Sequence, residues 1–153
     1  MIRGVWSRDT LGWVIAAALL PAIAVLLVEQ GAPAAQRMTI ALAVILGWQT
    51  LFRFSAGVPM SPTAAVTAVA VAVLASGEMA AWQLVLAVSF GSVLGELVFG
   101  GWGRNFLSPA VVTLAFVFIS FPEIRHPQAG LWLGVACAPA AALLLATGIL
   151  AWR

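Results

Sequence analysis

The chain has 153 residues, of which 63% are hydrophobic and only 8% are charged, and its mean hydropathy is +1.10. Soluble globular domains carry about a quarter charged residues, so this composition excludes an ordinary soluble domain and indicates an integral membrane protein. The excess positive charge comes from arginines scattered singly along the chain. Such scattering is typical of membrane-topology signals, not of a nucleic-acid-binding surface.

Six apolar segments follow one another in what we expect to be a single membrane domain, residues 1–153, and each is predicted to be a transmembrane or partly re-entrant helix. They cover about residues 11–28, 38–52, 62–76, 81–99, 109–121 and 131–151. A full span needs roughly 20 residues, so the first, fourth and sixth segments are long enough and the other three are short. The third and fifth begin at Ser-Pro, a pattern typical of broken helices that line a cavity.

The positions of the arginines set the predicted orientation. With six crossings and a cytoplasmic N-terminus, most of them lie on the cytoplasmic side, namely Arg3, Arg8, Arg53, Arg104 and Arg153. Arg37 and Arg125 then lie in outside loops. The positive-inside rule therefore favours an N-in and C-in topology.

The stretch between the fourth and fifth segments, Phe99 to Pro109, concentrates glycine, arginine and asparagine in a few residues. Glycine allows positive φ and a close approach of the backbone to a ligand. Ser108 is predicted to be the N-cap of the next helix and Pro109 its first residue. The free N–H groups of that helix would then face Arg104 and Asn105, which predicts a site for an anion or an electron-rich ring.

A second Ser-Pro start lies earlier in the chain. Met60 to Val66 resembles Leu107 to Thr113, 47 residues later. Both helices begin on the predicted cytoplasmic side, so their N-termini are expected to converge on one pocket. The alternative is that each Ser-Pro only starts a helix.

Two features of the fourth segment concern packing. Gly91 and Gly95, with Ala87 one turn earlier, form a small-xxx-small pattern that predicts close helix packing. Glu96 is costly inside a membrane, and we expect a structural ion pair with Arg104 or Arg53 more than a proton or cation site.

Two motifs resemble a known family. They are Phe99-Gly100-Gly101-x-Gly103-Arg104-Asn105-Phe106-Leu107-Ser108-Pro109-Ala110 and Phe118-Ile119-Ser120-Phe121-Pro122. Both are similar to the NqrB/RnfD family, membrane proteins of the sodium-pumping NADH:quinone oxidoreductase and of the related Rnf complex, and the similarity spans roughly this whole chain but only the N-terminal half of a family member. It implies an all-α integral membrane fold like one half of that urea-transporter-like architecture, in a bacterial inner membrane.

The resemblance also implies a role. It favours a small electron-carrying or non-catalytic subunit of a larger membrane oxidoreductase, with a soluble electron donor on the cytoplasmic side. Partners would be other membrane subunits or a second copy of the chain, because Ser61, Glu96 and Asn105 in short, broken helices would otherwise face lipid. A transporter-like or channel-like module and a cofactor-free accessory subunit are the alternatives.

The cofactor that the resemblance implies is a non-covalent flavin, either riboflavin or FMN. In the sodium-pump member of the family two asparagines contact a non-covalent riboflavin; Asn105 matches one of them, whereas Ser108 replaces the other with a shorter side chain that has one donor fewer. The expected cofactor-binding residues are Gly101, Gly103, Arg104, Asn105, Ser108, Ser61 and Thr63. The Ser-Gly-Ala-Thr motif whose threonine bears a covalent FMN in the family does not occur in this chain, so covalent FMN is not expected.

Other chemistry finds no support in the sequence. The chain has no phosphate-binding Walker loop, no zinc-ligand spacing and no Ser-His-Asp set. With one histidine, His126, and one cysteine, Cys137, neither a metal site nor a catalytic residue is predicted.

Overall fold

The computed structural model of the chain describes residues 8–61, 63–74, 79–101, 104–105, 107–123 and 138, and none of these residues lies in a strand. The helices are α1 (Arg8–Ala18), α2 (Leu20–Ala56), α3 (Thr63–Leu74), α4 (Ala81–Ser92) and α5 (Pro109–Ser120), and a π-helix, η1 (Val93–Leu97), extends α4. The all-α expectation is therefore confirmed for this part of the chain. The predicted segment 131–151 lies, except for Ala138, outside the described residues.

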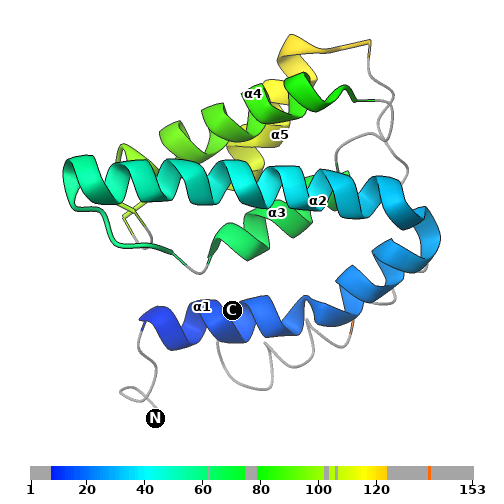
Figure 1. The fold of residues 1–153 in the computed structure, drawn as a ribbon, viewed down its shortest axis with the longest axis horizontal. Helices are drawn as coiled ribbons and strands as arrows, with labels where there is room; N and C mark the ends of the chain where they lie inside the picture. The colour runs from blue at the N-terminus through cyan, green and yellow to red at the C-terminus, as the bar shows by residue number, and fades with distance from the viewer. Residues whose placement is uncertain are drawn as a thin grey trace, which may run out of the picture.

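The first two predicted segments form one helical hairpin (Figure 1). The bend is at Gly31, whose φ of 60° and ψ of −139° are not helical, and Pro33 follows it. Glycine is needed there because L side chains rarely adopt this backbone conformation. The second arm of α2 runs from the bend to Ala56, about 25 residues or roughly 37 Å. The prediction that the second segment is short is therefore wrong.

The bend also changes the position of Arg37. Because the second arm starts directly after Gly31, Arg37 lies inside a helix and not in a loop. Its side chain is buried, with 7% exposed, and its guanidinium donates a hydrogen bond to Gln30 Oε1 across the bend. The prediction of an arginine in an outside loop is wrong.

Helix lengths divide the described chain into long and short elements. The stretch Gly12–Ala56 is long and apolar enough to cross a membrane, and only 22% of its most apolar window is buried inside the chain. The core helix of a soluble protein would be mostly buried. α3 and α5 have 12 residues each, about 18 Å, so neither crosses a hydrocarbon layer of roughly 30 Å alone. The third and fifth segments are thus short, as predicted.

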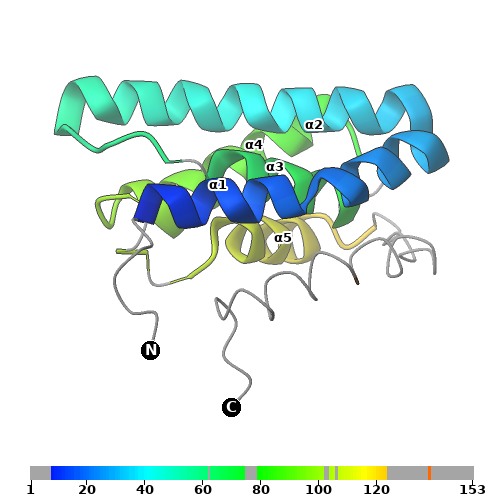
Figure 2. The same cartoon turned by 90° about the horizontal axis from the view of Figure 1, so that it is seen from below.

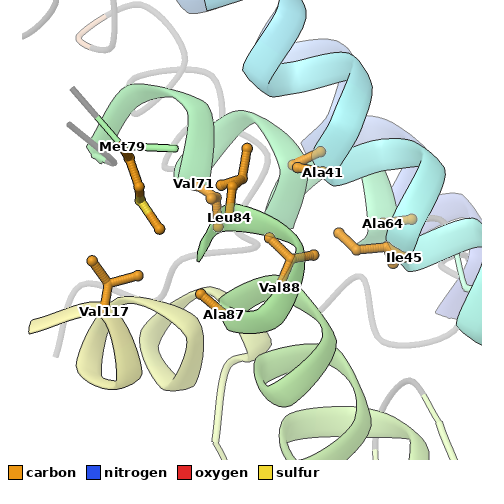
Figure 3. Close-up of a cluster of buried hydrophobic side chains, with 10 residues drawn as sticks. Ala41, Ile45, Ala64, Val71, Met79, Leu84, Ala87, Val88 and Val117 are labelled. Atoms are coloured by element: carbon orange, nitrogen blue, oxygen red, sulfur yellow. The ribbon is translucent and has the colours of Figure 1, made fainter. Parts of the chain in front are cut away.

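α3 and α4 lie between α2 and α5 (Figure 2), and both contact both of these helices. Small and branched side chains fill the core where the four helices meet (Figure 3), and they include Ala41 and Ile45 of α2, Ala64 and Val71 of α3, Leu84, Ala87 and Val88 of α4, and Val117 of α5. Small residues allow close approach of the helices. This packing brings the loops 57–61 and 98–108 out at one end of the molecule, which we call the loop end (Figures 1 and 2).

Candidate functional site

Two helices terminate at the loop end on glycines with positive φ. Gly57, with φ +67°, follows α2, and Gly100, with φ +96°, follows η1. The residues after them, Val58 and Gly101, are in contact: a Cβ placed on Gly101 would lie 2.8 Å from Val58 Cγ1. The two loops that precede the Ser-Pro helix starts therefore touch.

Backbone hydrogen bonds fix the start of the 98–108 loop. The Gly101 N–H donates to Glu96 O at 3.0 Å and the Gly100 N–H donates to Leu97 O at 3.1 Å. These two bonds make a Schellman motif, which requires positive φ at Gly100. The Val98 N–H donates to Val93 O at 3.0 Å and closes the π-helix, which no sequence pattern predicted. A π-turn is one extra residue in a helix, and apolar periodicity changes too little to reveal it.

Arg104 and Asn105 both lie in the turn that follows. Arg104 is exposed, and its side chain lies along Gly100, where a Cβ would be 3.4 Å from Arg104 Cδ. The C-terminal end of a helix carries partial negative charge, so this position suits a cation. Asn105 is half-buried, and its Nδ2 donates to Leu107 O at 3.3 Å. Asn105 therefore stabilises the turn.

Ser108 occupies the N-cap position of α5 and Pro109 follows as its first residue, as predicted. The Ser108 side chain, however, makes no capping hydrogen bond and is exposed. The contact of Ser108 with the first turn is made by its backbone carbonyl, which accepts from the Val112 N–H at 3.1 Å. The prediction that its hydroxyl caps the helix is wrong, because the hydroxyl lies on the open side of the loop.

Ser61 differs from Ser108 in its surroundings. It is buried, with 5% exposed, and its N–H donates to Gln49 Oε1 at 3.3 Å. Gln49 is itself only 2% exposed. The sequence analysis did not select Gln49, although a lone amide in an apolar helix is a usable signal of a buried polar contact.

Burial within the chain also changes the case for a partner. Ser61 and Glu96 are 5% and 4% exposed. Their own helices and loops cover them, so the expectation that they would face lipid without a partner is wrong. Asn105, which is half-buried, keeps part of its surface open at the loop end.

A cavity of about 540 Å³ opens beside Ser61, between α1, α2 and α3. Ser61 and Gln49 are its polar lining, and the other lining residues are Trp13, Leu42, Leu46, Pro59, Met60, Ala64 and Ala65. Its size lies in the range of small-molecule sites. No described residue of the 98–108 loop lines it.

The predicted cofactor-binding residues thus divide into three groups. Gly101 joins the two loops, while Arg104, Asn105 and Ser108 lie on the open side of the second loop. Ser61 lies at the cavity, and the backbone of Thr63 begins α3. Gly103 falls outside the described residues. Within the described ranges no group of three or more His, Cys, Asp or Glu side chains gathers to hold a metal ion.

Comparison with known proteins adds a family match. A model of the NQR2, RnfD, RnfE family matches residues 2–146, which is nearly the whole chain. The match includes both loops of the loop end and all the helices described above. The family that the two sequence motifs predicted is therefore confirmed.

Curated relatives share one name, which makes each of them the same component of a Na(+)-translocating NADH-quinone reductase. The protein from Pseudomonas aeruginosa is 39% identical over 88 residues, 58% of this chain and 22% of the relative. The one from Stutzerimonas stutzeri is 36% identical over 105 residues, 67% and 26%. The one from Chromohalobacter salexigens is 36% identical over 75 residues, 49% and 18%. The matched stretches therefore cover about a quarter or less of each relative.

Proposed function

The chain belongs to the NQR2, RnfD, RnfE family, and from this membership we propose that it is a small integral-membrane subunit that holds one non-covalent flavin and carries electrons within a larger redox complex. The observation that carries the proposal is the contact between the two loops at the loop end, where Gly101 packs on Val58. It gathers the glycine-rich turn, Asn105 and the second Ser-Pro start at one end of the molecule.

The exposed side chains support the membrane placement. Large apolar residues are turned outward on every helix, and examples are Trp13 at 67%, Val28 at 86%, Phe54 at 83%, Trp82 at 59% and Ile119 at 80% exposed. A soluble monomer rarely leaves contiguous apolar surface of this extent in water. Hydrocarbon is the solvent that such a surface fits.

Charges at the two ends of the molecule support an orientation with the loop end in the cytoplasm. Arg53 and Arg104 are exposed there, whereas Glu29 and Glu123 are exposed at the opposite end, beside the Gly31 bend and after α5. Arginine excess marks the cytoplasmic side. α1 begins at the loop end (Figures 1 and 2), so the N-terminus is cytoplasmic in this proposal, and so is the C-terminus.

Reporter fusions test the sidedness. Fusions at Met1 and at Arg153 should both report a cytoplasmic location, and a fusion in the Glu29 to Ala32 bend should report the outside. A cytoplasmic bend would overturn the orientation, and with it the sidedness of the flavin.

The residues of the second loop fit a flavin in part. A flavin ring presents carbonyls and ring nitrogens at its edge and needs donors there. Asn105 supplies an amide whose present partner is a loop carbonyl at 3.3 Å, and Ser108 supplies an exposed hydroxyl. Arg104 supplies a cation that favours the reduced, more negative cofactor, and the cofactor supplies the electron transfer itself.

The absorbance spectrum of the purified protein tests the function. We expect flavin bands, with a flavin content near one per chain, and Asn105→Ala should weaken binding by about 1–3 kcal/mol because a donor at the ring edge is lost. Gln36→Ala is the matched control, because Gln36 is an exposed amide on α2 far from the loop end.

Two outcomes would count against the proposal. A colourless protein would leave the accessory-subunit or transporter alternatives. Equal flavin content in Asn105→Ala and in the control would move the flavin away from this loop.

Membership in a larger assembly is part of the proposal. The relatives are named as subunits, and this chain matches only a part of each of them. We propose that other membrane subunits, or a second copy of the chain, complete the complex. Mass measurement after gentle detergent extraction tests this, and a stable monomer of 15.9 kDa as the only species would contradict it.

A further inference from the structure

Two glycines on α4 and η1 control the place where α5 begins. We infer that Gly91 and Gly95 are positioning residues for the 98–108 loop. The cofactor part of this inference rests on the proposed function, whereas its structural part does not.

Gly95 receives the first residue of α5. A Cβ on Gly95 would lie 2.9 Å from Pro109 Cα, 3.3 Å from Pro109 N and 3.4 Å from Pro109 Cβ. These atoms belong to the backbone and to a rigid ring, so they have no rotamer by which to move aside. Any side chain at Gly95 therefore has to displace the start of α5.

Gly91 receives the next turn of α5. A Cβ on Gly91 would lie 1.8 Å from Thr113 Oγ1 and 2.8 Å from Pro109 O. Thr113 is fully buried, and its hydroxyl donates to Pro109 O at 2.8 Å. The first turn of α5 thus folds its own polar groups together and lays them on the backbone of α4.

This contact fixes both ends of the loop. One end is the Schellman motif that follows η1, directly after Gly95 in the chain. The other end is Ser108, which precedes Pro109. Because Gly95 lies against Pro109, the distance that the loop has to bridge is set by helix packing and not by the loop residues. Asn105 and Ser108 are consequently presented by a contact in which neither takes part.

The comparison with another helical glycine shows that this role is local. Gly47 lies in the middle of α2, and a Cβ there would meet nothing within 4 Å. Gly47→Ala is therefore a matched control: the same atom is added to a helix of the same protein, but without a contact.

The test measures loop position directly. Nitroxide labels on Met60→Cys and Leu107→Cys, in a Cys137→Ser background, report the distance between the two loops, because both positions are exposed. We expect Gly95→Ala to shift or broaden this distance distribution and Gly47→Ala to leave it unchanged. An unchanged distribution in a folded Gly95→Ala protein would overturn the inference.

A second variant covers the case in which Gly95→Ala does not fold. Thr113→Ala adds no atom and removes the hydroxyl that fills the space beside Gly91, so it should fold and broaden the same distance distribution. If Gly95→Ala fails to fold and Thr113→Ala leaves the distance unchanged, the positioning role is wrong.

Flavin measurements on the same proteins separate the two proposals. Gly95→Ala should lower flavin content several-fold and shift the midpoint potential of the flavin that remains, which a loss of folded protein alone would not do. A loop distance that shifts in Gly95→Ala, in a protein that carries no flavin even without the substitution, would sink the proposed function and leave the positioning role intact. Bound flavin with an unchanged loop distance would do the reverse.

Discussion

The two loops at the loop end share one pattern and differ in what surrounds it. Each starts at a helix-ending glycine with positive φ, Gly57 or Gly100, and each ends at a serine that leads into a short helix. In the first loop the serine is buried and its N–H is held by Gln49. In the second loop the serine is exposed and its side chain makes no capping bond.

The difference teaches that the Ser-Pro pattern sets where a helix starts but not what its serine does. Ser61 lies under α2, whose Gln49 reaches it, and it lines a cavity. Ser108 follows a turn closed by Asn105 and faces outward. The first loop is thus the buried support and the second is the accessible surface, although their sequences are alike.

The largest expected effect sharpens this comparison at the two glycines. Gly101→Ala should destabilise the protein by about 2–4 kcal/mol, because φ is +91° and the new Cβ would lie 2.8 Å from Val58 Cγ1. Gly57→Ala should cost only about 1–2 kcal/mol, because φ is +67° but no atom lies within 4 Å. Thermal unfolding in detergent measures both.

The double variant Val58→Ala with Gly101→Ala checks the cause. Removing the Val58 methyl groups should recover part of the loss at Gly101. Equal losses for Gly57→Ala and Gly101→Ala, with no recovery in the double variant, would mean that the two loops do not press on each other.

The next effect concerns the buried support. Gln49→Leu keeps a side chain of similar size but removes the oxygen that accepts the Ser61 N–H, so we expect a loss of about 1–3 kcal/mol. Thr50→Ala is the control, because the exposed Thr50 hydroxyl only donates to Leu46 O in its own helix. We expect the control to stay within about 0.5 kcal/mol. A Gln49→Leu protein as stable as the control would remove the proposed asymmetry between the loops.

The smallest effect on stability is expected at Ser108. Since its hydroxyl makes no capping bond and is exposed, Ser108→Ala should change the free energy of unfolding by less than about 0.5 kcal/mol. Ser108→Asn, which adds a donor at the loop surface, should keep or tighten flavin binding. A large loss of stability in Ser108→Ala would show that the serine caps α5 after all.

The sequence alone went far on the local elements. Apolar runs predicted the helices, Pro109 predicted the start of α5, and the spacing of Gly91 and Gly95 predicted close packing that the structure has. These features depend on the rigid ring of proline and on the size of glycine, which act within a few residues. The family was also readable, because its motif is concentrated in one loop.

Other features were decided by contacts between residues far apart in the chain. The burial of Ser61 depends on Gln49, which lies 12 positions earlier on another helix, and the burial of Arg37 follows from a bend that let one helix continue past it. The apolar pattern did not reveal the π-turn that carries Glu96, and only packing shows that Gly101 lies on Val58. The sequence by itself determined which helices form and where each begins, because those choices depend on neighbouring residues. Which polar groups face the interior and which face a ligand was decided by the tertiary structure, because burial depends on what the other helices cover.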